Sequence, residues 1–351
     1  MTLRKVAIIG SGNWGSTIAK IIGNNVQKYD EFDKEVRMWV FEELIGGQKL
    51  TSIINEKHEN VKYLPGIALP TNVVAIPDVV ETAQNADIYI FVLPHQFLGK
   101  VCQQLKPVIK KTAYGVSLIK GLATSGDSGI RLLTDMIREE LSIPCAVMMG
   151  ANLASEVSRE NYCEGTIGAS DPVIGMEIKK LFQTDYFRMV VIKDEVGAEL
   201  CGALKNIVAV GAGLIEGLGY GDNTKAAVIR LGFMEMKSFI YQFFGDRNPQ
   251  EGTFLESCGV ADLITTCYGG RNKQMGIALT KGNENLAELE NKLLNGQSAQ
   301  GPLTASEVYS MLKGRNLLEK FPLFAAVHRI CSRQLPPTEL INCLSNHPEH
   351  M

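Results

Sequence analysis

The sequence predicts an α/β protein in two parts, an N-terminal doubly wound, mostly parallel sheet and a C-terminal all-helical domain. The chain opens with a β-branched segment that runs directly into a glycine-rich turn. Short apolar strands then alternate with helical patterns up to about residue 193, which is typical of a doubly wound sheet. From residue 194 onward only helical periodicity remains. A chain of 351 residues has room for about two domains. We therefore expect domains over residues 1–193 and 194–351.

The strands of the first domain are expected where short apolar or β-branched runs occur. They are Val6–Ile9, Val36–Phe41, Val73–Ile76, Ala86–Leu93, Tyr114–Ile119, Cys145–Gly150 and Phe187–Ile192. Residues 44–70 are expected to connect two of these strands. In the second domain the periodicity predicts helices over 195–217, 225–244, 250–266, 272–280, 284–294, 303–313 and 322–333. Five glycines between Gly211 and Asn223 predict a close helix crossing or a turn.

Composition excludes several classes of function. A formal net charge of −3 gives no basic field for nucleic acid or an anionic membrane. The eight cysteines form no C-x-x-C pair and most lie in apolar stretches, as in reduced intracellular proteins. The five histidines form no HExxH motif, so we expect no metal site, and His347 and His350 are placed at a solvated C-terminal end. We find no signal peptide, and the run Ile88–Pro94 is too short to span a membrane. We expect a cytoplasmic protein without integral membrane association.

The glycine-rich turn Gly10–Gly15 predicts a dinucleotide-binding site, because it lies between a strand and a helix. Gly10 permits the tight turn, Gly12 lets the backbone approach a pyrophosphate, and Gly15 lets the helix pack closely on the strand. The helix N-terminus then offers N–H groups and the positive end of its dipole to an anion. The alternative is a glycine-rich turn that binds no ligand.

Residues after the second predicted strand favour NAD over NADP, and an aromatic follows the fourth. Phe41 takes the end position of the second strand, and Glu42 comes 27 residues after Gly15, farther than the usual ~20. This spacing argues against a carboxylate on the ribose and places Phe41 against the adenine. No arginine follows that would bind a 2′-phosphate. Phe97, after the strand 86–93, is either a wall of the nicotinamide site or a core aromatic.

Lys205 lies in an apolar helical stretch, residues 199–212. Its neighbours three and four positions away are all small or apolar, so no salt bridge within the helix holds its ammonium. Desolvation lowers the pKa of a lysine, and such a lysine can exchange protons near neutral pH. Alternatively, its stem lies on the core and its charged head reaches solvent.

Two further groups could accompany this lysine. Asp262 and Thr266 are four positions apart and share a helical face. A carboxylate in this apolar stretch needs a partner, and Lys205 is the partner we expect. Otherwise Asp262 only stabilises a helix N-terminus. Lys120 follows a predicted strand at its carboxyl end, where it would meet an anionic or carbonyl substrate. A solvated loop lysine is the alternative.

An anion site is predicted at Gly269–Asn272. Two glycines before a helix allow converging N–H groups, and an arginine fork and an amide follow at once in Arg271 and Asn272. Such a site would hold a phosphate or a carboxylate. Together with a dinucleotide domain, it predicts an anionic substrate that is oxidised or reduced.

These motifs resemble the eukaryotic cytosolic NAD-dependent glycerol-3-phosphate dehydrogenases, a family that includes the enzyme and a close paralogue. The matching strings cover essentially the whole chain. They are GSGNWG at 10–15, MWVFEE at 38–43, PHQF at 94–97, LIKG at 118–121, MGAN at 149–152, CGALKNIVAVGAG at 201–213, GDNTKAAVIRLG at 221–232, ESCGVADLITTCYGGRN at 256–272 and QGP at 300–302. The resemblance implies a Rossmann-type NAD domain, interconversion of dihydroxyacetone phosphate and sn-glycerol 3-phosphate with NADH and NAD, and a homodimer.

The resemblance also implies roles for individual residues. Lys205 matches the catalytic proton donor and acceptor, with Lys120 and Asp262 beside it in the catalytic group. The residues that would contact the phosphate-ester substrate are Lys120, Asn206, Thr266, Arg271 and Asn272. Those that would contact the cofactor are Gly10, Ser11, Gly12, Asn13, Trp14, Gly15, Phe41, Phe97, Ala154, Arg271 and Gln300.

One departure from the family and two rival functions remain. The family often carries a lysine two residues before Gln300, where this chain has Ser298, so we expect a change in cofactor affinity rather than in chemistry. A non-catalytic NAD sensor would have lost the acid/base residues, and these are present. A 3-hydroxy-acid dehydrogenase would use the site at 269–272 for a carboxylate. Comparing a phosphate ester with a hydroxy acid as substrate separates the two enzymes.

Overall fold

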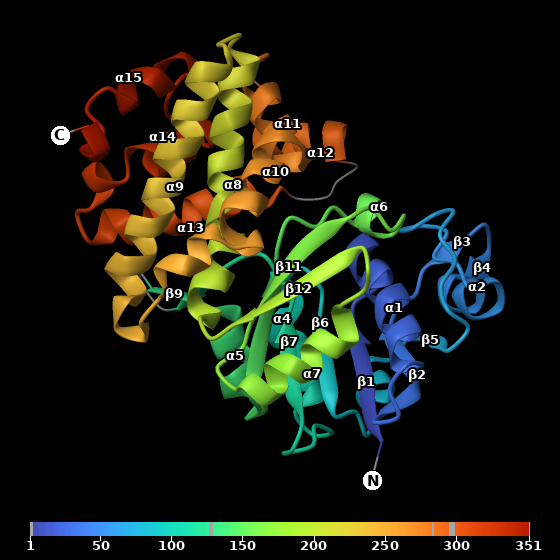
Figure 1. Ribbon diagram of the computed structural model, residues 1–351. Coiled ribbons are helices and arrows are strands. Elements are labelled where there is room, and N and C mark those ends of the chain that lie inside the picture. Colours follow the sequence, from blue (N-terminus) through green and yellow to red (C-terminus); the bar gives the residue numbers. More distant parts are fainter. Residues whose placement is uncertain (1–2, 126–128, 283, 295–298, 351) are drawn as a thin grey trace. The chain divides into compact units, whose positions relative to one another are not determined.

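A computed structural model describes residues 3–125, 129–282, 284–294 and 299–350 (Figure 1). The chain divides into two compact units. The first, which we call the sheet unit, comprises residues 1–119 and 133–195. The second, the helical unit, comprises residues 120–132 and 196–351. The short segment 120–132 therefore belongs to the helical unit, although strands of the sheet unit flank it in the sequence.

The described part of the sheet unit contains an eight-stranded sheet in the order β12-β11-β10-β7-β6-β1-β2-β5. The strands are β1 (Arg4–Ile9), β2 (Phe32–Trp39), β5 (Val73–Ile76), β6 (Ile88–Phe91), β7 (Tyr114–Ser117), β10 (Cys145–Met149), β11 (Cys163–Gly168) and β12 (Phe187–Ile192). The helices are α1 (Asn13–Val26), α2 (Leu50–Lys57), α3 (Val79–Ala83), α4 (Leu98–Leu105), α5 (Leu133–Leu141), α6 (Ala154–Val157) and α7 (Pro172–Phe182). This is the predicted doubly wound sheet.

The strand order places a ligand crevice at the carboxyl end of β1. Beside β1 lie β2 on one side and β6 on the other, both parallel to it. The chain runs outward from β1 in both directions, so β1 and β6 flank a topological switch point, where open α/β sheets bind ligands. Ile18 and Ile22 of α1 pack into the apolar core of this unit with Val6 and Ile8 of β1. The core thereby fixes the glycine-rich turn that connects β1 to α1.

Strand β11 was not predicted, and it differs from its neighbours. It pairs antiparallel with β10, with Ile167 opposite Met148, whereas the other adjacent pairs described in this sheet are parallel. Gly165 and Gly168 interrupt the apolar pattern that marked the other strands. Packing requires glycine at position 168, since a Cβ there would lie 2.9 Å from the Cα of Glu195.

Two local predictions in the sheet unit were also wrong. β2 ends at Trp39, where its pairing with β1 and β5 ends, so Phe41 follows the strand rather than ending it. The segment 44–70 is not a plain connection, because it contains the hairpin of β3 (Leu44–Ile45) and β4 (Gln48–Lys49) and then α2.

The helical unit is built around α8 (Glu195–Gly217), in which every residue from Val196 to Ile215 is buried. Its other helices are α9 (Asp222–Phe244), α10 (Asp262–Tyr268), α11 (Gly270–Leu279), α12 (Leu286–Leu294), α13 (Gln300–Gly314), α14 (Pro322–Cys331) and α15 (Leu340–Leu344). A short hairpin joins β8 (Ala123–Ser125) to β9 (Gly129–Arg131). Short 3-10 turns across both units are η1 (His95–Phe97), η2 (Gly245–Arg247), η3 (Glu251–Leu255), η5 (Leu318–Lys320), η6 (Pro337–Glu339) and η7 (Pro348–His350).

Helix α8 is long and apolar enough to cross a bilayer, but its apolar window is wholly buried inside the protein. Its glycines allow a close crossing with α11, as predicted. A Cβ at Gly213 would lie 2.1 Å from the carbonyl oxygen of Lys273, and one at Gly276 would lie 2.2 Å from that of Val210. Gly219 has φ +80° and forms the turn before α9. The glycine-rich stretch thus provides both a crossing and a turn.

The predicted helix over 250–266 is wrong. The chain forms η3, then a π-helical turn, η4 (Ser257–Ala261), and then α10. A Cβ at Gly259 would lie 2.2 Å from the carbonyl oxygen of Phe254, so a tight backbone contact interrupts the helix here. π turns of this kind are frequent at functional sites, and this one leads directly into Asp262.

The C-terminal end is not solvated at His347, contrary to expectation. His347 is buried, and its Nε2 lies 3.1 Å from a carboxylate oxygen of Glu235 on α9. Glu235 also accepts the backbone N–H groups of Leu323 and Phe324 at 2.6 and 2.9 Å. Burial raises the pKa of Glu235, and these hydrogen bonds oppose the rise. The last turn of the chain is therefore tied to α9 and α14 through one carboxylate.

Candidate active site

The glycine-rich turn has packing reasons for two of its three glycines. Gly10 has φ +127°, and a Cβ there would lie 2.4 Å from the carbonyl oxygen of Val92. A Cβ at Gly15 would lie 2.3 Å from the carbonyl oxygen of Gly10. Gly12 has φ −63°, which any residue can adopt, and a Cβ there would meet no described atom within 4 Å. Within the described residues, neither packing nor backbone geometry requires glycine at position 12, and close approach of a ligand there stays a prediction.

The start of α1 provides an anion-binding geometry. Among the described residues, no side chain caps its N-terminus. The hydroxyl of Thr17 donates to the carbonyl of Asn13 at 2.8 Å and lies 3.4 Å from the carbonyl of Ala154, so the first turn of α6 adjoins that of α1. Trp14 packs edge-on against Phe187. Its side chain thus serves the core, while the backbone of this turn stays available to a ligand.

Two aromatic side chains of the sheet unit are exposed, as a ligand-facing role requires. Phe41 after β2 is 71% exposed, and Phe97 at the end of η1 is 53% exposed. The core alternative for Phe97 is therefore wrong. Exposed aromatic rings supply flat apolar surfaces on which a nucleotide base can stack.

The two acids after Phe41 are used inside the protein. Glu42 accepts hydrogen bonds from the hydroxyl and backbone N–H of Thr51 at 2.6 and 3.2 Å. Glu43 accepts from the hydroxyl of Tyr63 at 2.8 Å and pairs with Lys62. These contacts hold residues 51, 62 and 63 against the segment that follows β2.

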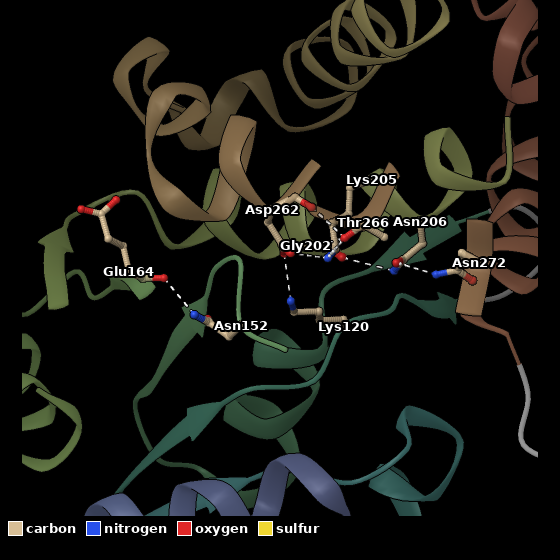
Figure 2. Close-up of polar contacts among 9 residues, drawn as sticks. All are labelled: Lys120, Asn152, Glu164, Gly202, Lys205, Asn206, Asp262, Thr266 and Asn272. Atoms are coloured by element: carbon tan, nitrogen blue, oxygen red, sulfur yellow. Dashed lines mark hydrogen bonds and ion pairs between the residues drawn. The ribbon is translucent and has the colours of Figure 1, made fainter. Parts of the chain in front are cut away.

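Lys205 of α8 lies in a buried polar cluster of the helical unit (Figure 2). Only 5% of its side chain is exposed, and its Nζ donates to Asp262 Oδ1 and, at 2.6 Å, to Thr266 Oγ1. The expected partner of Asp262 is therefore present, and the solvent-exposed alternative for Lys205 is wrong. The other carboxylate oxygen of Asp262 accepts from Lys120 Nζ at 2.9 Å. One carboxylate thus joins two ammonium groups.

This environment changes the acidity of Lys205. Burial lowers its pKa to about 7; Asp262 opposes the decrease, and the positive charge of nearby Lys120 adds to it. Thr266 fixes the direction of the amine, because its hydroxyl donates to the backbone carbonyl of Asp262 at 2.7 Å and accepts from Lys205. The result is an oriented amine that can take up and release a proton near neutral pH.

Asn206 and Asn272 form a buried amide network beside this cluster (Figure 2). Asn272 Nδ2 donates to Asn206 Oδ1 at 2.8 Å, and Asn272 Oδ1 accepts the N–H of Gly301 at 2.8 Å. Asn206 Nδ2 donates to the carbonyl of Gly202 at 3.3 Å. The network ties α8 to the starts of α11 and α13.

Arg271 and Gln300 lie at the starts of the two helices that this network joins. Gly270 has φ +87°, so the turn before Arg271 needs glycine, as predicted. Arg271 is exposed in the second position of α11. Gln300 begins α13, and within the described residues its buried Oε1 has no hydrogen-bond partner. Ser298 lies outside the described residues.

The direct ion pair between Lys120 and Asp262 was not predicted, although the family resemblance placed both residues beside Lys205. The two residues are 142 positions apart, and no spacing rule connects them. None of the eight cysteines, all of which lie in the described part of the chain, forms a disulfide. The described residues contain no group of three or more His, Cys, Asp or Glu side chains that could hold a metal ion.

Comparison with known proteins covers both halves of the chain. A family model described as the N-terminus of NAD-dependent glycerol-3-phosphate dehydrogenase matches residues 5–174, and the corresponding C-terminal model matches residues 194–342. The chain is 58% identical over 351 residues to the cytoplasmic glycerol-3-phosphate dehydrogenase (NAD+) of Homo sapiens, with all of both chains covered. It is 57% identical to that of Drosophila virilis, covering 99% of this chain and 98% of the relative.

Solved structures agree. Glycerol-3-phosphate dehydrogenase from Saccharomyces cerevisiae superposes with a TM-score of 0.90 at 44% identity, covering 98% of this chain and all of the other. The Plasmodium falciparum glycerol-3-phosphate dehydrogenase gives a TM-score of 0.93 at 38% identity, covering 98% and 96%.

Proposed function

Since this chain belongs to the NAD-dependent glycerol-3-phosphate dehydrogenase family, we propose that it interconverts dihydroxyacetone phosphate and sn-glycerol 3-phosphate with NADH and NAD. The observation that carries the proposal is the buried Lys205, held by Asp262 and Thr266 with its pKa lowered to about 7. A dehydrogenase must supply a proton to an alkoxide in one direction and remove it in the other, and an amine with this pKa serves both.

The sheet unit is proposed to bind NAD. The backbone of Gly10–Gly15 would receive the pyrophosphate, Phe41 and Phe97 would contact the two ring systems, and Ala154 would line the same crevice. From the helical unit, Gln300 and Arg271 would contact the cofactor. The open space at Gly12 and the uncapped start of α1 fit a bound pyrophosphate. When bound, the cofactor supplies or accepts the hydride at the substrate carbon.

The polar cluster is proposed to move the proton. During reduction, the Lys205 ammonium donates a proton to the developing alkoxide; during oxidation, the neutral amine accepts it. Asp262 and Thr266 accept hydrogen bonds from two of its N–H groups and so orient the nitrogen, which would exchange its proton with the substrate oxygen. Lys120 adds positive charge where negative charge develops. Asp262 keeps the pKa of Lys205 from falling further.

The start of α11 is proposed to bind the substrate phosphate. Arg271 offers a charged donor beside the helix N-terminus, and Asn206 and Asn272 each keep a second amide N–H beyond the bonds described above. Binding energy from the phosphate would then position a carbon that does not itself contact these groups.

We also propose residues 1–193, apart from the segment 120–132 of the helical unit, as the NAD-binding domain, and residues 194–351 as the substrate domain. We further propose a homodimeric assembly and a cytoplasmic location. The relatives named cytoplasmic support the location. Size-exclusion chromatography with light scattering tests the assembly, and a monomer at micromolar concentration would contradict it.

The decisive experiment follows NADH absorbance in the presence of dihydroxyacetone phosphate, dihydroxyacetone or a 3-oxo acid. We expect rapid loss of absorbance with the phosphate ester and much slower loss with the other two. Preferred use of the oxo acid would assign the site at 269–272 to a carboxylate instead. NADH binding without turnover of any of the three would indicate a sensor.

A further inference from the structure

A loop that is distant from the glycine-rich turn in the sequence contacts the buried side of this turn. The loop spans residues 58–69 in the sheet unit. It is closed by a hydrogen bond from the N–H of Leu69 to the carbonyl of His58 at 2.7 Å and by a bridge between Glu59 and Ala68. Glu43, which follows β2, holds the middle of this loop through Tyr63 and Lys62. Asn60 stands at the start of this loop and is fully buried.

The amide nitrogen and the amide oxygen of Asn60 are both hydrogen-bonded, and these contacts determine which of the two atoms is nitrogen. Nδ2 donates to the carbonyl of Ser11 at 2.9 Å and to the hydroxyl oxygen of Ser16 at 2.8 Å, while Oδ1 accepts the N–H of Tyr63 at 3.1 Å. The reversed amide would face an N–H with its own N–H groups. The hydroxyl of Ser16 in turn donates to the same Ser11 carbonyl at 3.1 Å. Two buried donors therefore hold one carbonyl of the glycine-rich turn.

Fixing this carbonyl fixes the next N–H. The chain contains no cis peptide among the described residues, and in a trans peptide the C=O and the following N–H point in opposite directions. Because the Ser11 carbonyl is held toward the buried Asn60 and Ser16, the N–H of Gly12 points away from them. Gly12 is also the position where no described atom would meet a Cβ. Its N–H therefore belongs to the open backbone surface at the start of α1.

We propose that Asn60 is a positioning residue for the cofactor: it holds the Ser11–Gly12 peptide so that the Gly12 N–H is aimed at the dinucleotide pyrophosphate before the cofactor arrives. This inference rests on the proposed NAD-binding function. Without the Asn60 donor, the peptide can rotate, and the pyrophosphate must then order it on binding. That ordering lowers affinity for the cofactor without altering the proton chemistry of the helical unit.

The substitution Asn60→Asp tests this directly. It keeps the size of the side chain and its acceptor toward Tyr63, but it replaces the donor by an oxygen that faces the Ser11 carbonyl. We expect the Kd for NADH, measured by fluorescence titration, to rise by about 10- to 100-fold, the range for losing a hydrogen bond to a charged group. The KM for NADH should rise in parallel. The KM for dihydroxyacetone phosphate and kcat at saturating NADH should change much less.

Asn25→Asp is the matched control. Asn25 lies on α1, the helix that also carries Ser16, and it is buried like Asn60. Its Nδ2 donates to the backbone carbonyls of Leu181 and Gln183 at 2.9 and 3.1 Å. It is 13 residues from Gly12, or about 20 Å along α1. The melting temperature of Asn25→Asp should fall about as much as that of Asn60→Asp. Its Kd for NADH should equal that of the unaltered protein. Ser16→Ala, which removes one of the two donors, should give a smaller rise in Kd than Asn60→Asp.

The outcomes separate this inference from the function on which it rests. If the unaltered protein does not bind NADH, the proposed cofactor function fails first. If it binds NADH and folded Asn60→Asp binds equally well, the positioning role is wrong. Equal weakening in Asn60→Asp and Asn25→Asp would also overturn it, because a general loss of stability would then account for both. Should Asn60→Asp not fold, Ser16→Ala decides: an unchanged Kd overturns the proposal.

Discussion

The two sites of this protein are built in opposite ways. The glycine-rich turn is a run of consecutive residues, Gly10–Gly15, whose properties come from the backbone: one positive φ, one close helix contact and one open position. The lysine cluster is assembled from separate parts of the helical unit, with Lys120, Lys205 and Asp262 from three segments. Its properties come from burial and charge.

Cofactor binding and proton transfer in this protein therefore depend on separate physical quantities. Backbone geometry at the turn does not depend on the charge of any side chain. The pKa of Lys205 depends on burial, on Asp262 and on Lys120. Substitutions at one site should therefore damage one property and spare the other.

The largest effect is expected at Lys205. Lys205→Ala, and Lys205→Met with its similar volume, should lower kcat by about 10²- to 10⁴-fold, the usual contribution of a general acid–base group. The Kd for NADH should remain within a few-fold, since the turn lies in the sheet unit. Stopped-flow single-turnover rates and NADH titration measure the two. Near-normal turnover in either folded variant would remove Lys205 from the mechanism.

Arg271→Ala should have the next largest effect, and it should depend on the substrate. Loss of a charged donor to phosphate is expected to lower kcat/KM for dihydroxyacetone phosphate by about 10- to 100-fold. Activity with unphosphorylated dihydroxyacetone should fall much less. Steady-state kinetics with both substrates provide the measurement. Equal losses for the two would show that Arg271 does not act on the phosphate.

Sequence reasoning succeeded where the cause is local. The turn, the doubly wound sheet and the apolar stripe of α8 follow from spacing within a few residues. The Lys205–Asp262 contact could also be predicted, because a carboxylate in an apolar stretch needs a partner. The second partner, Lys120, could not, since no local pattern joins residues 142 positions apart. His347 was predicted to be solvated because its neighbours in the sequence are polar. It is buried because it pairs with Glu235 on α9, which is distant in the sequence.

Gly12→Ala tests whether the backbone at this position contributes to cofactor binding and not to stability. The apo protein should tolerate it, because φ is −63° and no described atom lies within 4 Å of the added Cβ. The Kd for NADH should nevertheless rise by about 10-fold, as the methyl group separates the backbone from the pyrophosphate. Differential scanning fluorimetry and NADH titration measure both. Gly10→Ala is the contrasting variant: with φ +127° and a contact of 2.4 Å, it should destabilise the fold itself.

The smallest expected effect concerns the pH at which kcat/KM is half-maximal, and this pH reports on the pKa of Lys205. Burial lowers the pKa of Lys205 to about 7 in the ligand-free protein, and kcat/KM reports groups of the free enzyme. Reduction needs the ammonium, so kcat/KM for dihydroxyacetone phosphate should fall as pH rises through about 7. Oxidation needs the neutral amine, so kcat/KM for glycerol 3-phosphate should rise over the same range.

Asp262→Asn removes the charge that opposes the decrease in pKa. The ammonium then becomes less stable, the pKa of Lys205 falls further, and both midpoints should move to lower pH. Ionisation of the substrate phosphate is the same for both proteins, so the difference between their profiles reports the enzyme. A folded Asp262→Asn variant with unchanged midpoints, or with midpoints at higher pH, would show that Asp262 does not set the acidity of the amine. The low pKa of Lys205 would then come from burial and Lys120 without Asp262, and the backbone properties of the glycine-rich turn would be unaffected.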